Sequence, residues 1–195
     1  MLRKTVKYSL ILLVKLIAYF HVFLYRVFKF EYKTVSIMLS RWPGWFGIQL
    51  RRQFYGSTLK RCGQDLNVGY GAYIVYPEVE IGDRVTIEEH CVVSLCTIGD
   101  DVTFAARVST LSGAHHHDVD DLSTTFQNSK SFARRIILGD NIWVGTHAVI
   151  MNDVSSHSVI GAGAVVTKVF PPYSIIGGVP ARLIRQRGKK CNQPH

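Results

Sequence analysis

Acidic residues are nearly absent from the first third of this 195-residue chain. Residues 1–61 contain twelve lysines and arginines but one acid, Glu31, which gives a net charge of +11. Residues 62–195 carry a net charge of −2, so the overall +9 arises entirely in the N-terminal segment. This charge lies on an apolar stretch without a base-stacking motif, which argues against nucleic-acid binding.

Cysteine is also scarce, with only Cys62, Cys91, Cys96 and Cys191 and no CxxC pair. Four such residues in a chain of this length exclude a disulfide framework and indicate a reduced, cytoplasmic protein. Charged residues are only 19% of the chain and apolar residues 47%, which excludes a disordered tail-like protein.

The basic segment begins with an apolar run over residues 8–25 that is interrupted by Ser9, Lys15 and His21. A membrane span needs about 20 apolar residues, and Lys15 near its middle would cost about 3 kcal/mol. Wound as a helix, the run has basic residues on one side and apolar residues on the other. The basic residues are Lys4, Lys7, Lys15, Arg26 and Lys29, and the apolar ones are Leu13, Leu16, Phe20, Leu24 and Val27. This pattern predicts a helix in the membrane interface rather than a span or a signal peptide.

A second short helix is expected from about residue 45 to 55, after the break at Pro43 and Gly44. Trp42, Trp45 and Phe46, beside the cations Arg51 and Arg52, suit a lipid headgroup layer. The alternative, that the helices only cap the following domain, stays open. We therefore predict residues 1–62 to be an amphipathic, membrane-associating helical segment.

Beyond Gly63 the apolar residues recur every six positions, which is neither helical nor simple alternation. The repeat includes Val68, Ile74, Ile81, Ile87, Val93, Ile98, Phe104, Leu138, Val144, Ile150, Ile160 and Val166. A small apolar residue often follows four positions later, and Gly-Asp follows Ile81, Ile98 and Leu138. Three such hexads would close a triangular coil of about 18 residues, so the pattern predicts a β-solenoid. Two spacings are short, from Val93 to Ile98 and from Ile150 to Ile160, and the second requires a tightened turn near residues 155–157.

The stretch 138–150, the Val159-Ile-Gly-Ala-Gly-Ala-Val-Val-Thr-Lys run, Pro171-Pro and Gly178-Val-Pro-Ala-Arg carry a family resemblance. The chain resembles the hexapeptide-repeat acyltransferases, in their sugar, exopolysaccharide and lipopolysaccharide O-acetyltransferase branch. The resemblance implies an all-β main domain over 63–187, a left-handed parallel β-helix, before a basic tail at 188–195. It also implies acetyl-CoA as co-substrate and a homotrimer whose sites lie between subunits.

The hexads stop over residues 112–136, which open with Gly-Ala-His-His-His-Asp. An excursion this long from a solenoid is usually functional, and a neutral imidazole can take the proton of an attacking hydroxyl. The resemblance places this general base on His115, with His117 as runner-up and His116 third. Consecutive histidines on an extended chain alternate sides, so we predict general-base catalysis and no metal site.

The resemblance also implies the coenzyme A contacts. The small residues Gly145 and Ala162 would leave room for the pantetheine arm, which Thr146 would contact. Thr167 and Lys168 would lie near the adenosine, and Lys168, Arg182 and Arg185 would attract its phosphates.

These features predict O-acetylation of a sugar hydroxyl, on a lipid-linked or surface-polysaccharide precursor, because the basic N-terminus favours an anionic membrane surface. The expected location is the inner face of the cytoplasmic membrane, bound peripherally. N-acetylation of an amino sugar or small amine, and a catalytically inactive membrane scaffold, remain the alternatives.

Overall fold

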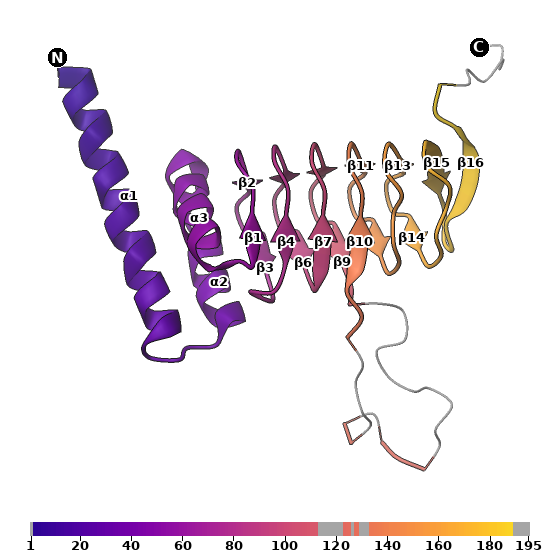
Figure 1. Cartoon of the computed structure of the whole chain (residues 1–195), viewed down its shortest axis with the longest axis horizontal. Helices are drawn as coiled ribbons and strands as arrows, with labels where there is room; N and C mark the ends of the chain where they lie inside the picture. The colour runs from indigo at the N-terminus through magenta and orange to yellow at the C-terminus, as the bar shows by residue number, and fades with distance from the viewer. Residues whose placement is uncertain (1, 113–122, 126, 129–132, 189–195) are drawn as a thin grey trace.

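The computed structural model describes residues 2–112, 123–125, 127–128 and 133–188 of the chain, with side chains from residue 9 onward. Three helices lie at one end of a β-solenoid whose coils stack along the long axis of the molecule (Figure 1). The helices are α1 (Leu2–Arg26), α2 (Tyr32–Ser40) and α3 (Gly44–Thr58). The predicted helices over residues 8–25 and 45–55 are thus present within α1 and α3, whereas α2 was not predicted.

The solenoid is built from three parallel sheets to which each coil contributes short strands in turn. The first sheet contains β1 (Arg61–Cys62), β4 (Glu80–Ile81), β7 (Cys96–Ile98) and β10 (Ile136–Leu138). The second contains β2 (Asn67–Val68), β5 (Thr86–Ile87), β8 (Thr103–Phe104), β11 (Trp143–Val144), β13 (Val159–Ile160), β15 (Ser174–Gly177) and the antiparallel β16 (Arg182–Gln186). The third contains β3 (Tyr73–Ile74), β6 (Val92–Val93), β9 (Ser109–Thr110), β12 (Val149–Ile150) and β14 (Val165–Val166). The predicted fold class, a parallel β-helix with N-terminal helices, is confirmed.

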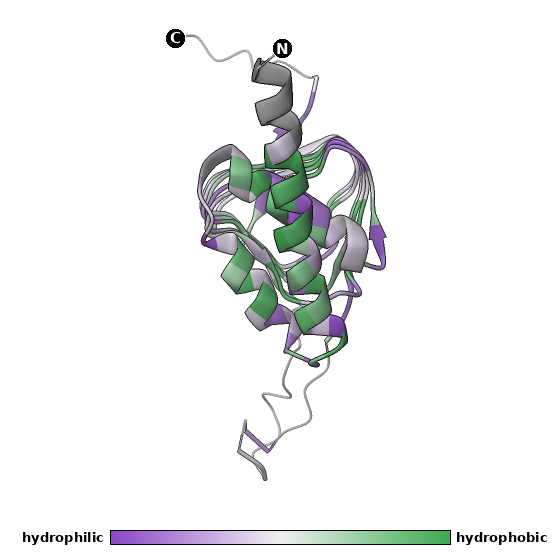
Figure 2. Ribbon diagram, turned by 90° about the vertical axis from the view of Figure 1, so that its left-hand side faces the viewer, coloured by the Kyte–Doolittle hydropathy of each residue, from purple (hydrophilic) through white to green (hydrophobic). Residues whose placement is uncertain are grey.

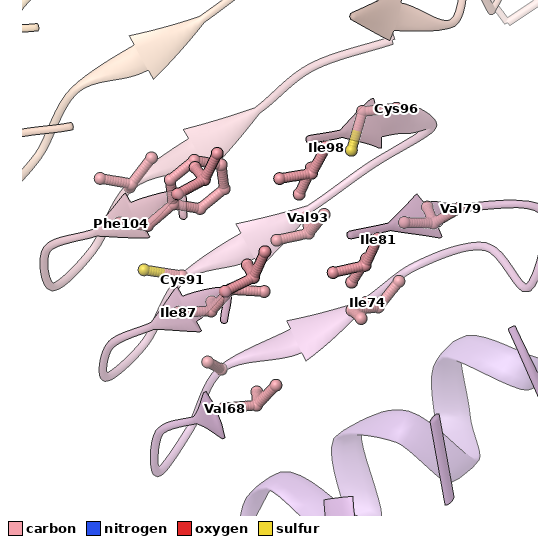
Figure 3. Packing of buried hydrophobic residues seen from close by; sticks show 14 of the residues in the cluster. Val68, Ile74, Val79, Ile81, Ile87, Cys91, Val93, Cys96, Ile98 and Phe104 are labelled. Atoms are coloured by element: carbon pink, nitrogen blue, oxygen red, sulfur yellow. The ribbon is translucent and has the colours of Figure 1, made fainter. Parts of the chain in front are cut away.

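The core follows the six-residue period. All twelve aliphatic or aromatic residues of the repeat are buried, with at most 1% of their surface exposed. Figure 3 shows those from Val68 to Phe104 pointing into the solenoid. The small residues four positions later, such as Val85, Cys91 and Ala148, are buried as well. Each coil therefore places its apolar side chains against those of its neighbours, and that burial stabilises the stack.

The three corners of the solenoid are named here by the sheets they join. The first corner joins the first and second sheets, the second corner joins the second and third, and the third corner leads into the next coil. Tight turns keep the strands short, and non-glycine residues such as Arg84, Asp101 and Asn141 adopt left-handed φ values of 53–58° at the first corner. Successive coils differ in length. Arg61 pairs with Glu80, nineteen residues on, whereas Trp143 pairs with Val159, only sixteen residues on. In that shortest coil the first-sheet strand is reduced to a single bridge at Val154, which accounts for the short spacing before Ile160.

The Gly-Asp pairs of the repeat form a ladder along the first corner. The Asp83 backbone N–H donates to Asp100 Oδ1 at 2.8 Å, and the Asp100 N–H donates to Asp140 Oδ1 at 2.8 Å. A Cβ on the preceding glycine would clash with the next coil; at Gly99 it would lie 2.3 Å from Asp140 Oδ1. The motif therefore brings adjacent coils into close backbone contact.

Helices α2 and α3 cover the open end of the solenoid, as the capping alternative expects. Arg51 of α3 is fully buried and donates to the carbonyl oxygens of Val68 at 2.8 Å, Trp42 at 2.9 Å and Leu39 at 3.0 Å. The placement of Arg51 in a headgroup layer was therefore wrong, because this guanidinium satisfies backbone carbonyls at the end of the stack. Trp42 and Trp45, by contrast, are exposed.

Helix α1 lies outermost and packs on α3 through Val14, Ala18 and Val22. The apolar stripe named from sequence faces away from this contact, and Leu16, Phe20 and Val27 are 55–61% exposed. Figure 2 looks at this end of the molecule and shows hydrophobic residues along α1. Within the described part of the chain, Ser9–Arg26 is long and apolar enough to cross a membrane, and only 22% of this stretch is buried.

Candidate active site

The predicted catalytic loop leaves and re-enters the solenoid at the third corner, between β9 and β10 (Figure 1). The Arg134 N–H donates to the Ser112 carbonyl oxygen at 2.8 Å and closes the base of the loop. The Leu111 N–H donates to the Ile150 oxygen on the next coil at 2.8 Å. His115, His116 and His117 lie outside the described residues, so the choice of base among them stays a prediction.

Two arginines at the end of the loop fasten it to the coils on either side. The Arg134 guanidinium donates to Asn152 Oδ1 at 2.7 Å and contacts the Asp153 carboxylate at 3.2 Å. Arg135 reaches in the opposite direction and donates to the carbonyl oxygens of Glu78 at 2.7 Å and Cys96 at 3.0 Å. The re-entry point of the loop is thereby fixed by charge-assisted hydrogen bonds.

On the first sheet, Arg135 belongs to a small network of charged side chains with Glu80 and Lys60. Glu80 accepts from Lys60 Nζ at 2.7 Å and lies 3.8 Å from Arg135. The hydrogen bond from Lys60, together with the charges of Lys60 and Arg135, holds the pKa of the Glu80 carboxyl below its usual value. Glu80 is therefore ionised at neutral pH and available to pair with Arg135.

Sequence reasoning missed Arg134, Arg135 and Asn152. A signal was present, because the two arginines directly precede the buried β10 residue Ile136, and Asn152-Asp153 follows β12 at the corner. Polar residues at the two ends of an insertion can form hydrogen bonds that hold its ends together. Only the stacking of the coils shows which of these residues contact one another.

The third corner also carries Thr167 and Lys168. Asn152 Nδ2 donates to the Thr167 carbonyl oxygen at 3.0 Å, so Thr167 lies one coil beyond the residue that holds Arg134. Lys168 is exposed, and its Nζ lies 5.4 Å from the centre of the Phe170 ring. The predicted adenosine contacts and the loop base therefore share one corner.

The other predicted cofactor residues group at the second corner. Gly145 is buried, and a Cβ there would lie 2.5 Å from the Ala162 backbone nitrogen. The stacking of one coil on the next therefore requires glycine at this position. Thr146 is exposed and donates to the Ala106 carbonyl oxygen at 2.7 Å.

Strand β14 separates the two groups, and Arg182 lies beside it. The Ala181 N–H donates to the Val165 carbonyl oxygen at 2.8 Å, which places the exposed Arg182 at the edge of this strand. Arg185 lies farther along β16, where it pairs with Ile175. The structure brings together Gly145, Thr146, Ala162 and Arg182, and places Arg185 nearer the first corner. The cofactor role of each residue stays a prediction.

The described residues contain no group of three or more histidine, cysteine, aspartate or glutamate side chains arranged to hold a metal ion. The described cysteines Cys62, Cys91 and Cys96 are free thiols.

Comparison with known proteins shows relatives that share this architecture. No family model matches the chain. Galactoside O-acetyltransferase from Escherichia coli (strain K12) is 34% identical over 128 residues, which are 64% of this chain and 55% of that protein. Chloramphenicol acetyltransferase from Agrobacterium fabrum (strain C58 / ATCC 33970) is 32% identical over 172 residues, covering 80% of this chain and 70% of the relative. The chain belongs to the hexapeptide-repeat acetyltransferases. Its alignment with the galactoside enzyme spans little more than half of that enzyme's length.

One solved structure that is similar to this acetyltransferase contains coenzyme A. Galactoside acetyltransferase in complex with coenzyme A superposes with a TM-score of 0.66 at 28% sequence identity, covering 80% of each chain. The expected enzyme class, an acyltransferase, and the expected co-substrate, acetyl-CoA, are confirmed at the level of the family.

Proposed function

We propose that this acetyltransferase transfers the acetyl group of acetyl-CoA to a sugar hydroxyl on a lipid-linked or surface-polysaccharide precursor. The sugar is supported by the similarity to a protein named galactoside O-acetyltransferase. The observation that carries the lipid-linked part is α1, a helix with an exposed apolar side that packs directly on the cap of the catalytic solenoid.

The proposed chemistry is a direct acyl transfer. Neutral His115 takes the proton of the sugar hydroxyl while the oxygen attacks the thioester carbonyl carbon of acetyl-CoA. A backbone N–H stabilises the tetrahedral oxyanion. When the intermediate collapses, the carbon–sulfur bond breaks, the coenzyme A sulfur takes the proton back from the imidazolium, and the acetyl ester is released. His117 is the alternative base, and His116 the third choice.

We also propose a homotrimer, with each site shared between two subunits. Flat sheets with exposed apolar side chains suit association; on the solenoid Leu111, Ile137 and Trp143 are 38–54% exposed. Light scattering on the full chain should give three times the chain mass. A fully active monomer would refute this part of the proposal.

For location, we propose that α1 lies in the inner leaflet surface of the cytoplasmic membrane. A transmembrane path is disfavoured because α1 packs against α3 through Val14, Ala18 and Val22. If α1 crossed the membrane, α3 with its polar residues would have to enter the hydrocarbon layer, and so would Lys15. An interfacial position keeps that packing and leaves Leu13, Leu16 and Phe20 facing lipid.

Acceptor choice needs a direct test, because other acceptors are compatible with the same fold. Several relatives are named chloramphenicol acetyltransferases, and others serine acetyltransferases. Amino sugars are the further alternative, since a general base serves an amine as well as a hydroxyl. An inactive scaffold would transfer to none of them.

The experiment is an acceptor screen with labelled acetyl-CoA. The acceptors are lipid-linked sugars in vesicles, free sugars, amino sugars, chloramphenicol and serine. The full chain is compared with a variant whose apolar stripe is made polar, Leu13→Gln/Leu16→Gln/Phe20→Gln. We expect ester formation on the lipid-linked sugar, reduced in the variant, with transfer to free sugar equal in both proteins. Preferential transfer to chloramphenicol, serine or amino sugars, or no difference between the proteins on lipid-linked sugar, would contradict the proposal.

A further inference from the structure

A cleft of about 490 Å³ opens where the C-terminal end of α1 meets the end of α3. It is lined by Tyr25, Arg26, Lys29, Phe30 and Thr58. Three residues beyond the end of α1, Lys29 adopts a left-handed conformation with φ of 55°, and the Phe30 N–H donates to the Leu24 carbonyl oxygen at 3.3 Å. This turn places two cations, Arg26 and Lys29, on the same cleft.

The charge of the cleft is of one sign. None of its lining residues is acidic. Glu31, the sole acid of the first 61 residues, is exposed and accepts a hydrogen bond from the Thr34 hydroxyl at 2.8 Å. Arg26 Nη2 donates to the Ser57 carbonyl oxygen at 2.8 Å, which orients the guanidinium at the rim. An oriented guanidinium beside an ammonium group is suited to a phosphate group.

The surroundings of the cleft are apolar and exposed. Phe23, Val27, Phe28 and Phe30 are 45–61% exposed, and the Phe23 and Phe28 rings pack edge to face with centroids 5.5 Å apart. A free phosphate ion would make no use of these side chains. A phosphate that is attached to hydrocarbon would use both the cations and the aromatic rings.

We propose that this cleft binds the phosphate group of an anionic membrane phospholipid, with the four apolar side chains inserted beside its glycerol and acyl region. The inference rests on the proposed membrane association and goes beyond it. It assigns a defined headgroup site to the C-terminal end of α1, in place of a diffuse attraction of the whole basic segment. The site would set the depth and rotation of α1 at the surface, with the apolar stripe toward lipid.

The test compares two double variants of the full chain in binding to vesicles of phosphatidylcholine with phosphatidylglycerol. Arg26→Gln/Lys29→Gln removes the two cations of the cleft. Lys15→Gln/Lys33→Gln removes two exposed cations of the same helical region that do not line it. If the attraction were diffuse, each lost charge would weaken binding about fivefold, and the two pairs would lose equal affinity. We expect the cleft pair to lose at least about tenfold more affinity than the control pair.

Two further measurements keep the result interpretable. Arg26→Lys/Lys29→Arg retains both charges and should retain binding, and thermal melting checks that every variant is folded. Inorganic phosphate should compete no better than sulfate at equal ionic strength, because the lipid part contributes to binding. Equal losses in the two pairs, or specific displacement by inorganic phosphate, would overturn the headgroup site while leaving membrane association intact. A wild-type chain that does not bind vesicles would overturn both.

Discussion

Arg134 Nη2 donates a 2.7 Å hydrogen bond to Asn152 Oδ1, across the boundary between the coil that carries the loop and the next coil. Through its other amide atom Asn152 donates to the Thr167 carbonyl oxygen at 3.0 Å. Three residues far apart in sequence therefore connect the re-entry of the histidine loop with the predicted adenosine contact. The described end of the loop is thus connected to the corner that carries Thr167.

Replacing Arg134 with alanine should lower kcat/KM by about 10–100-fold, because a small displacement of a catalytic group is costly in rate. Arg134→Lys should recover part of the loss. The matched control is Arg84→Ala, which removes a similarly exposed arginine that pairs with Asp101 at 2.7 Å at the first corner. Steady-state kinetics of the three variants, with thermal melting to confirm folding, make the comparison. Unchanged kinetics in Arg134→Ala, or an equal loss in Arg84→Ala, would show that this contact does not position the loop.

Gly145 should be intolerant of alanine. The added Cβ would lie 2.5 Å from the Ala162 nitrogen and 2.9 Å from its Cα, and backbone cannot move aside as a flexible side chain can. We expect Gly145→Ala to lower the free energy of unfolding by about 1–3 kcal/mol. Gly56→Ala in α3 meets nothing within 4 Å and should raise it by about 0.5–1 kcal/mol. Denaturant titration of both variants checks the opposite signs, and a neutral Gly145→Ala would show that the coils are packed less closely.

Arg51 should be among the most sensitive positions of the cap. Burial lowers the pKa of its guanidinium, yet the group stays charged and donates to four carbonyl oxygens. Arg51→Met would leave those buried oxygens without donors, so we expect a loss of about 3 kcal/mol or more in the free energy of unfolding. Arg52→Met is the neighbouring control: Arg52 is half-buried and gives one hydrogen bond, to Leu66 at 2.7 Å. Equal and small losses in the two variants would contradict this account of the cap.

The described thiols should be unreactive in the folded protein. Burial raises the pKa of Cys62 and Cys91 to about 11 and that of Cys96 to about 12. Because the thiolate is the reactive form, its fraction at about pH 8 falls by roughly a hundredfold or more for each thiol. In a Cys191→Ser background, alkylation should be slow in the native state and complete in guanidinium chloride. Rapid labelling of Cys96 in the folded protein would refute this prediction.

The sequence was most informative where one physical rule repeats. An apolar residue at every sixth position fits the short strands of a solenoid, in which each such residue points into the core. Val68, Phe104 and Ile150 could therefore be assigned to the core from the sequence. The Gly-Asp pairs were visible too, although the ladder from Asp83 to Asp100 could only be recognised once the coils were stacked.

Less could be predicted where a role depends on contacts between distant segments. Arg51 reads as a surface cation, because nothing in its neighbourhood reveals that Leu39, Trp42 and Val68 direct carbonyl oxygens toward it. Helix α2 is short, and its helical character comes from packing on the solenoid rather than from a strong local pattern. Arg134 needed the same long-range information.

The central claim is that a histidine of the 112–136 loop is the general base of acetyl transfer, and the replacement of His115 tests it most directly. Transfer rate and coenzyme A affinity are measured on the full chain for His115→Ala, with His117→Ala and His116→Ala as matched controls. The account predicts a rate about 10²–10⁴-fold lower in His115→Ala with coenzyme A affinity retained, and much smaller effects in the controls. Near-normal turnover by His115→Ala with a collapse in His117→Ala would move the role to His117. Near-normal turnover by all three variants would contradict the claim.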